Sequence, residues 1–308
     1  MKILSSGVAA ATLLPIAVVA TENLPQIPFA EAVRLPESKQ WVVTPWYAYS
    51  VFRKLWIGST KVSIETQSQI DFEMNDGMVR LEYGLTDRWA LDATVGYTSA
   101  ATRAWNPKNH VETTQGLMDS QLGLRYSVLD EHPAQSWYVP TLTARLGAII
   151  RGTYDVDFPM APGDGASGFE ASLLMTKTFA KFGLGAYADV GYRLRSNHVP
   201  QTVFGSAGLS ETIKSDWKIT SVIFYAGYRG LYDLNGSNLS GERVAGPPHD
   251  FVDLNYSRHA QEIYHLGELG IGLTDQAGRR YFLSASHPFE GQNTGKVNNF
   301  IIGVNWPL

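Results

Sequence analysis

The sequence predicts an all-β fold, a transmembrane antiparallel up-and-down β-barrel, from three observations. The chain begins with an export signal, strand-like segments alternate between apolar and polar residues, and the connections between these segments are alternately short and long. Only helices and closed barrels satisfy their backbone hydrogen bonds inside a bilayer. After residue 20, no uncharged apolar stretch reaches the length of a spanning helix. A barrel is therefore the expected architecture.

The N-terminal residues have the pattern of a secretory signal peptide. Lys2 supplies the positive charge, the apolar run Gly7–Ala20 has 14 residues, and Val18 and Ala20 are small residues at the positions that a signal peptidase reads. The run is shorter than the roughly 20 residues of a spanning helix, and Pro15 interrupts it. We expect cleavage after Ala20. The expected organisation is a signal peptide at 1–20, a periplasmic N-terminal segment at 21–40 and an outer-membrane β-barrel at 41–308.

The composition excludes several classes of protein. The chain contains no cysteine, which excludes disulfide scaffolds, thiolate metal sites, cysteine nucleophiles and a lipid anchor at a cysteine. Removal of residues 1–20 takes away one of the 25 basic residues and leaves 24 against 29 acidic residues. Proteins that bind nucleic acid usually present a basic face. We therefore expect no nucleic acid partner.

The strand signal is an alternation with a period of two. From residue 89 the odd positions carry Trp, Leu, Ala, Val and Tyr, while the even positions carry Ala, Asp, Thr, Gly and Thr. Similar alternation recurs at 121–128, 182–194 and 299–306. Side chains on a strand point to opposite faces in turn, so these segments have one apolar and one polar face, as in outer-membrane barrels. About twelve strands are predicted, near residues 41–54, 68–83, 89–99, 117–129, 137–151, 169–180, 182–195, 216–227, 229–236, 259–273, 281–289 and 297–306.

The connections predict which end of the barrel faces which side of the membrane. Short polar turns are expected at Leu85–Arg88, Asp130–Ser136, Ala180–Lys181 and Thr274–Arg280. Long loops rich in Pro, Gly and Asn are expected at Ser99–Gly116, Arg151–Gly168, Ser196–Ser215 and Asn235–Arg258. Barrels of this class have short periplasmic turns and longer external loops. Between Gly227 and Leu231 almost no turn separates two of the predicted strands.

Aromatic residues near the predicted strand ends suggest interfacial girdles. In a soluble protein the same residues would be ordinary core aromatics, but their position beside predicted turns favours the membrane interface. The expected girdle residues are Trp41, Trp46, Tyr83, Trp89, Trp137, Tyr138 and Tyr192.

One segment resembles a known family. Leu81–Tyr97 (LEYGLTDRWALDATVGY) combines a strand, a Gly-Leu-Thr-Asp-Arg turn and a returning strand. It resembles the outer-membrane transporters of the phenol meta-pathway family, and Gln121–Tyr126, Thr141–Arg151 and Gly270–Ala285 fit the same layout. The resemblance implies a small outer-membrane channel for hydrophobic or aromatic compounds. At the C-terminus the chain departs from the usual final aromatic residue, because Pro307 and Leu308 follow Trp306.

Charged residues on the polar faces are the candidate functional residues. Facing lipid at the bilayer midplane, Arg or Lys would cost roughly 2–4 kcal/mol, which favours the lumen. There they would either line a water-filled channel or pair into a plug that keeps the barrel shut, and the sequence leaves both open. The expected lumen-lining residues are Arg80, Glu82, Asp92, Asp119, Arg125, Arg145, Asp189, Arg193 and Glu268.

Catalytic and metal sites are not expected. His259, His265 and His287 lie near Ser284 and Ser286, as in a barrel lipase, but the chain has no Gly-x-Ser-x-Gly elbow. Acidic and histidine residues in the loops are those of solvated loops, and no glycine-rich phosphate loop is present. We therefore expect no catalytic residue, no metal and no cofactor.

The expected function is passive uptake of small solutes through an outer-membrane channel. The expected partners are outer-membrane lipids, the barrel-assembly machinery, which would bind the C-terminal strand, and a small-molecule solute. The first alternative is a closed structural or surface-interaction barrel with a salt-bridged lumen. A hydrolase of the outer membrane is the second alternative.

Overall fold

The protein forms a single closed β-barrel. The computed structural model describes residues 33–63, 70–104, 111–131, 139–154, 163–179, 183–214, 218–236 and 260–308. In these ranges no helix is both long and apolar enough to cross a lipid bilayer. The strands are β1 (Trp41–Ile57), β2 (Thr60–Ser63), β3 (Ile70–Thr86), β4 (Trp89–Ala104), β5 (Val111–Leu117), β6 (Ser120–Leu129), β7 (Thr141–Ile150), β8 (Gly168–Phe179), β9 (Leu184–Arg195), β10 (Thr202–Lys214), β11 (Ile219–Asp233), β12 (Ile263–Asp275), β13 (Arg280–Gln292) and β14 (Gly295–Pro307).

Antiparallel pairing joins strands that follow one another in the chain. The last strand, β14, pairs with β1, and this seam closes the sheet. The short strands β2 and β5 only extend the pairing of β1 and β4, so twelve strands make up the wall. The predicted all-β barrel of about twelve antiparallel strands is therefore confirmed.

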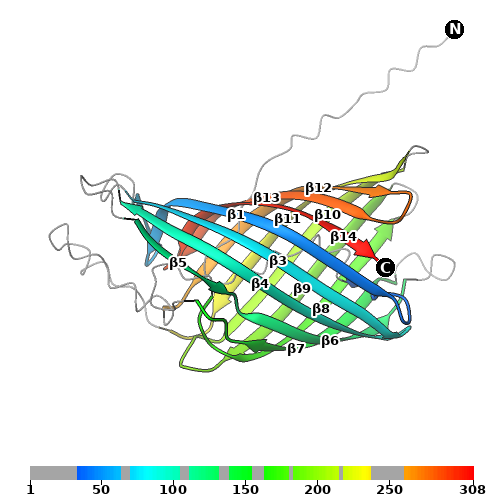
Figure 1. The fold of residues 1–308 in the computed structure, drawn as a ribbon, viewed down its shortest axis with the longest axis horizontal. Coiled ribbons are helices and arrows are strands. Elements are labelled where there is room, and N and C mark those ends of the chain that lie inside the picture. Colours follow the sequence, from blue (N-terminus) through cyan, green and yellow to red (C-terminus); the bar gives the residue numbers. More distant parts are fainter. Residues whose placement is uncertain are drawn as a thin grey trace, which may run out of the picture.

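The barrel has two distinct ends (Figure 1). At one end lie the start of β1, the end of β14 and the connections β3–β4, β6–β7, β8–β9, β10–β11 and β12–β13. We call this the turn end. The opposite end carries β2, β5 and the remaining connections, and we call it the loop end. Up-and-down pairing alone places the two sets of connections at opposite ends.

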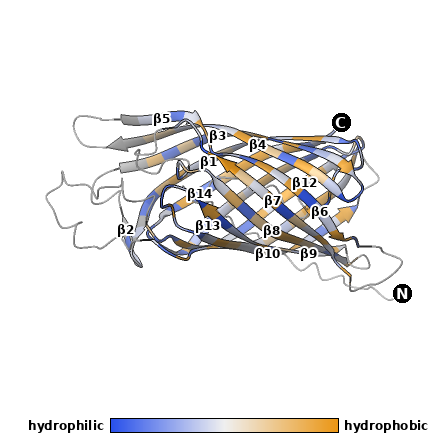
Figure 2. Ribbon diagram, turned by 90° about the horizontal axis from the view of Figure 1, so that it is seen from below, coloured by the Kyte–Doolittle hydropathy of each residue, from blue (hydrophilic) through white to orange (hydrophobic). Residues whose placement is uncertain are grey.

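Hydrophilic and hydrophobic residues alternate along most strands (Figure 2), and the large apolar side chains of this alternation are exposed on the outer face. In β7, Leu146 is 66% exposed on the outside, while the neighbouring inner residues Thr143 and Arg145 are buried. Many large apolar side chains, among them Phe169 and Ile302, are likewise exposed on the outer face. A continuous apolar outside is what a barrel in hydrocarbon requires.

The predicted strands are wrong between residues 196 and 236. Ser196–Ser215 was expected to be one long loop, but it contains β10, joined to β9 by a short connection. The segments 216–227 and 229–236, expected to be two strands, form the single strand β11. One strand more and one strand fewer leave the predicted number of strands unchanged. Gly227 is therefore a strand residue and not a turn residue. A glycine is needed at this position because a Cβ would lie only 2.2 Å from the hydroxyl of Tyr187.

Other long loops are also shorter than expected. In the segment Ser99–Gly116, β4 continues to Ala104 and β5 pairs back onto it. At the loop end β13 and β14 are separated only by Asn293 and Thr294. The predicted loop Asn235–Arg258 lies almost wholly outside the described residues. The loop between β7 and β8 is long, and the structure describes both of its ends.

Residues 33–40, expected to be part of a periplasmic N-terminal segment, run from inside the barrel, where Val33 is buried, to its turn end, where Glu37, Ser38 and Lys39 are exposed. Val33 is fully buried against Leu174, Tyr187 and Tyr225 of β8, β9 and β11. From there the segment crosses the lumen to the start of β1, which lies between β14 and β3 in the wall. At the turn end its backbone pairs with β3, because Lys39 N donates to Gly84 O at 2.7 Å. We call residues 33–40 the luminal segment.

Candidate functional site

The inner wall carries a connected set of ion pairs at mid-barrel. Arg145 Nη2 lies 2.8 Å from Asp92 Oδ2, and Arg145 Nη1 lies 2.9 Å from Glu170 Oε1. Arg193 Nη2 lies 2.6 Å from the other oxygen of Glu170. Each of these side chains is less than a tenth exposed. We call the whole set the charge belt; it consists of Arg80, Glu82, Asp92, Arg125, Arg145, Glu170 and Arg193.

Two glycines make the charge belt possible. Gly123 of β6 and Gly147 of β7 lie in register between Asp92 and Glu170. A Cβ on Gly123 would lie 2.6 Å from Asp92 Oδ2 and 2.7 Å from Arg145 Nε. The missing side chains therefore leave room for the Arg145 guanidinium to lie along the wall and reach Asp92 across β6.

The charge belt lines the wall and does not bridge the lumen. Glu170 of β8 pairs with Arg193 of the adjacent strand β9. The other two pairs span one intervening strand: Glu82 of β3 with Arg125 of β6, and Asp92 of β4 with Arg145 of β7. The side chains therefore neutralise one another along one side of the barrel. The segment that does cross the lumen is the luminal segment.

A second, smaller set lies next to the charge belt. Arg229 Nη2 of β11 is 2.7 Å from Glu268 Oε2 of β12. On β9, Asp189 accepts a hydrogen bond from Ser206 Oγ. Together the two sets hold five arginines and five carboxylates, so as a group they are formally neutral.

The wall next to the charge belt is mostly apolar, although it also holds Asp76 of β3, which is buried in register with Ala48 and accepts a 2.6 Å hydrogen bond from Thr98 Oγ1. Trp46 and Ala48 of β1, Met78 of β3 and Ile301 of β14 are buried together with Met118, which precedes β6, and Phe282 of β13. Trp46 was expected in the interfacial girdle, and this expectation is wrong: it is 6% exposed on the inner face. Trp41 and Trp46 are five positions apart, and an odd spacing places the two side chains on opposite faces of one strand.

The other expected girdle residues divide into described and undescribed ones. Trp41 lies on the outer face at the turn end with its ring 4.6 Å from that of Tyr83. Trp89 lies on the same face at the same end, 4.6 Å from Tyr126. Tyr192 is on the outer face near the loop end, and its hydroxyl donates to Gln201 Oε1 at 2.7 Å. Trp137 and Tyr138 lie outside the described residues.

Asp119 belongs to a separate cluster at the loop end. Its carboxylate accepts hydrogen bonds from Gly152 N and the Tyr154 hydroxyl, both at 2.8 Å, and lies 3.1 Å from Arg195 Nη1. Arg195 Nη1 also lies 2.5 Å from Asp164 Oδ2. These contacts hold the described parts of the β7–β8 loop against β9. We call Asp119, Tyr154, Asp164 and Arg195 the loop-end cluster.

Burial raises the pKa of Asp164 to about 6, although Arg195 beside it acts in the opposite direction. The nearby carboxylates of Asp119 and Asp233 raise this pKa further. Burial also raises the pKa of the Tyr154 hydroxyl above its ordinary value. The loop-end cluster thus holds two carboxylates and one guanidinium in a confined space.

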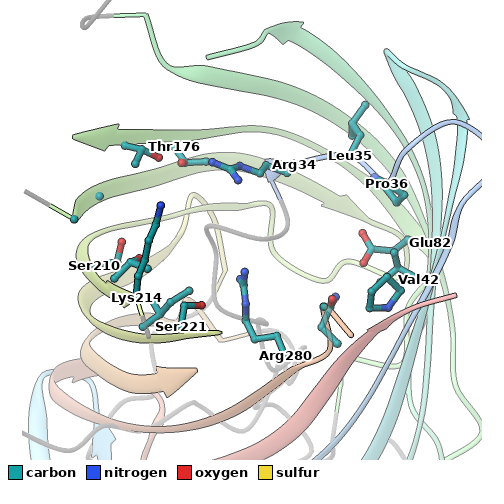
Figure 3. Close-up of a pocket in the computed structure, with 18 of the residues that line it drawn as sticks. Arg34, Leu35, Pro36, Val42, Glu82, Thr176, Ser210, Lys214, Ser221 and Arg280 are labelled. Atoms are coloured by element: carbon teal, nitrogen blue, oxygen red, sulfur yellow. The ribbon is translucent and has the colours of Figure 1, made fainter. Parts of the chain in front are cut away.

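A cavity of about 500 Å³ occupies the lumen at the turn end (Figure 3). Arg34, Leu35 and Pro36 of the luminal segment form one side of it. The remaining lining comes mainly from strands at the turn end, including Glu82, Lys214 and Arg280. Binding pockets for small molecules commonly have volumes of about 300–1,000 Å³, so this space is large enough for a small solute.

Several lumen residues were missed by the sequence reasoning. Glu170, Arg195 and Arg229 lie on inner faces, and the alternation with Phe169, Leu194 and Tyr228 is a signal that could have identified them. Arg34, Lys214 and Arg280 carry no such signal, because each lies outside or at the edge of a predicted strand. Their positions depend on the luminal segment and on β10.

The histidines considered for catalysis contact residues other than serine. His265 Nδ1 contacts the Tyr228 hydroxyl on the outer face, and His287 Nδ1 lies 2.9 Å from Asn298 Oδ1. Among the residues that the structure describes, no three His, Asp or Glu side chains are arranged to hold a metal ion. His259 lies outside the described residues.

The comparisons with known proteins identify the fold. No protein-family model matches the chain, and no curated protein matches it. Among solved structures, an outer membrane channel from Pseudomonas putida F1 superposes with a TM-score of 0.65 at 13% identity, over 90% of this chain and 98% of that one. The translocator domain of the autotransporter NalP from Neisseria meningitidis gives 0.46 at 12% identity, over 90% and 91%. At these identities the first likeness shows that the chain has the fold of an outer-membrane β-barrel.

Proposed function

We propose that the protein is an outer-membrane channel for small solutes, which the luminal segment holds closed in this structure. A closed barrel with an apolar outside supports a location in the bacterial outer membrane, with the turn end in the periplasm. The same location implies export through a signal peptide at 1–20 and assembly by the barrel-assembly machinery, which would read the C-terminal strand β14.

The observation that carries the proposal is the direction of the ion pairs. The charges of the belt are paired, as expected of a plug, but the pairs join neighbouring parts of the wall and do not cross the lumen. Charged side chains that line a wall are found in pores that solutes pass. What closes the lumen is a short segment that leads into β1 and leaves a cavity of about 500 Å³ beside it. Such a segment can be displaced without breaking the wall.

The solute class of the resembled family fits part of the lumen. The apolar wall around Trp46, Met78 and Phe282 would contact a hydrophobic or aromatic solute. Membership of the phenol meta-pathway family is part of this proposal. The closed structural barrel remains the second candidate, and the nearly complete burial of the charge belt favours it.

Single-channel recording in planar bilayers tests the proposal. The refolded full chain is expected to show discrete ohmic steps with long closed periods. The variant Val33→Asp places a charge among Leu174, Tyr187 and Tyr225, so it should displace the luminal segment and lengthen the open periods. Heat-modifiable, folded protein that never conducts in either form would exclude the channel and leave the structural barrel.

A further inference from the structure

The cavity at the turn end has a marked excess of positive charge. Three cationic side chains line it: Arg34 from the luminal segment, Lys214 from the end of β10 and Arg280 from the start of β13. Figure 3 shows that they come from three separate parts of the chain and extend toward a common space. Arg280 is held in place in part by a 3.3 Å hydrogen bond from its Nε to Thr274 Oγ1.

The carboxylate that lines the cavity is already engaged. Glu82 forms an ion pair with Arg125 and lies 3.4 Å from Arg80 Nη2. Among the described residues that line the cavity it is the one acidic residue, against three cations. At the same end Asp275 pairs with Arg279 at 2.7 Å, outside the cavity lining. The cavity therefore presents a positive potential to a solute.

The rest of the lining is of two kinds. Apolar surface comes from Leu35, Pro36, Val42 and Ile223, and Ser210, Ser221 and Thr176 add hydroxyl groups. A bare inorganic anion would satisfy the cations but leave the apolar surface facing water. A neutral apolar solute would cover that surface and leave the cations unused. An anion that also has an apolar body would contact both the cations and the apolar surface.

We propose that this cavity binds small organic anions that carry one carboxylate on an apolar body. The inference rests on the proposed channel function, because it names the solute class at the periplasmic mouth of that channel. Guanidinium groups bind carboxylates through charge-assisted hydrogen bonds, which are stronger than neutral ones. The apolar body would lie against the luminal segment, so an occupant contacts both the wall and the segment that closes the barrel.

Calorimetric titration of the full chain in detergent, with benzoate as the probe, tests the site. Benzoate should bind saturably. The variants Lys214→Gln and Arg280→Gln should each weaken that binding about tenfold or more, the size expected for the loss of a charge-assisted hydrogen bond. The matched control Arg88→Gln removes a cation from the β3–β4 turn at the same end but outside the cavity lining, and should leave binding unchanged. Lys214 is exposed, so its variant should fold even if the Arg280 variant does not.

Two further probes separate the parts of the proposal. Benzamide has the same ring without the charge and should bind much more weakly than benzoate. Sodium phosphate carries charge without an apolar body and should also bind more weakly. Equal binding of benzamide, equal binding of phosphate, or no saturable binding of benzoate would each overturn the proposal.

The titration does not depend on conduction. Saturable benzoate binding by a barrel that never conducts would refute the channel and uphold the anion site. A conducting barrel without benzoate binding would uphold the channel and refute the site. The two failures are therefore distinguishable.

Discussion

The Oγ1 of Thr143 donates a hydrogen bond to the backbone carbonyl of Val33 at 2.6 Å, and both residues are fully buried. Thr143 belongs to the wall strand β7, and Val33 belongs to the luminal segment. This bond fixes the far end of the segment, while the pairing of Lys39 and Gln40 with Gly84 fixes the near end. The luminal segment is therefore held to the wall at two points.

A covalent bond between the luminal segment and the wall should keep the proposed channel closed. The chain has no cysteine, so Val33→Cys with Thr143→Cys introduces a single possible disulfide at two residues that already touch. Oxidised protein is expected to stay closed in planar bilayers, and dithiothreitol should restore the openings. Each single variant serves as the control for the loss of the native side chains. Equal conductance of the oxidised and reduced double variant would show that the luminal segment does not gate the lumen.

The charge belt should be sensitive to the loss of a single arginine. Arg145→Met leaves Asp92 and Glu170 buried with one partner fewer each, and the loss of one partner from a buried ion pair costs about 3–5 kcal/mol. The free energy of unfolding, measured by guanidinium titration in vesicles, should fall by that order. Arg279→Met, which removes the exposed partner of Asp275, is the matched control and should change it little. Similar effects of the two variants would mean that the charge belt is hydrated.

The loop-end cluster should make stability depend on pH. The pKa of Asp164 is raised to about 6 in the folded protein from an ordinary value of 3.8. Below about pH 4 the carboxyl is protonated in both the folded and unfolded states, so its contribution is fully present. Between pH 4 and 6 only the folded state keeps the proton, so stability falls as the pH rises through this window.

The variant Asp164→Asn isolates this effect. The melting temperature of the wild type relative to the variant should fall between pH 4 and 7 and then level off. Comparison with the variant cancels, to first order, the titration of Asp119 and Asp233, which also influence Asp164. Parallel curves for the two proteins would place the titration elsewhere.

Depth in the membrane should determine the cost of a charge on the outer face. Leu146 lies near the middle of β7, and Leu129 ends β6 at the turn end, and both are exposed on the outside. Leu146→Arg should destabilise the barrel in vesicles by roughly 2–4 kcal/mol, and Leu129→Arg by about 0–1 kcal/mol. A cost that does not differ between the two positions would contradict the proposed membrane span.

The alternation of side chains predicted most of the wall. In β4, β6, β9 and β14 large apolar residues alternate with small or polar ones, and the period of two identifies both the strand and its faces. In β10 the contrast is weak, because Gly205, Ala207 and Gly208 are small on both faces. A strand without contrast is indistinguishable from a glycine-rich loop by pattern alone.

The prediction of two strands in place of β11 has a different cause. Gly227 resembles a turn residue, but it is a place where the aromatic ring of Tyr187 crosses the inner wall. Only the neighbouring strand shows why a glycine is needed there. The luminal segment could not be predicted either, because Val33 is an ordinary apolar residue until Leu174, Tyr187 and Tyr225 surround it.

The candidate site was predictable only in its central part. Arg80, Glu82, Asp92, Arg125 and Arg145 are recognisable from their strands. Their pairing across an intervening strand was not, since it depends on Gly123 being in register with Asp92. The cations of the turn-end cavity come from three distant parts of the sequence, and only closure of the barrel brings them together.

The distribution of charge along the axis of the lumen gives the barrel a polarity. The loop-end cluster sets two carboxylates against Arg195, whereas the turn-end cavity holds three cations, and its one carboxylate, Glu82, already belongs to the charge belt. An ion that moves along this axis therefore meets opposite potentials at its two ends. In the proposed channel we therefore expect rectification: current carried by anions should differ between positive and negative voltage of equal size, and the direction of the larger current should report which way the barrel has inserted.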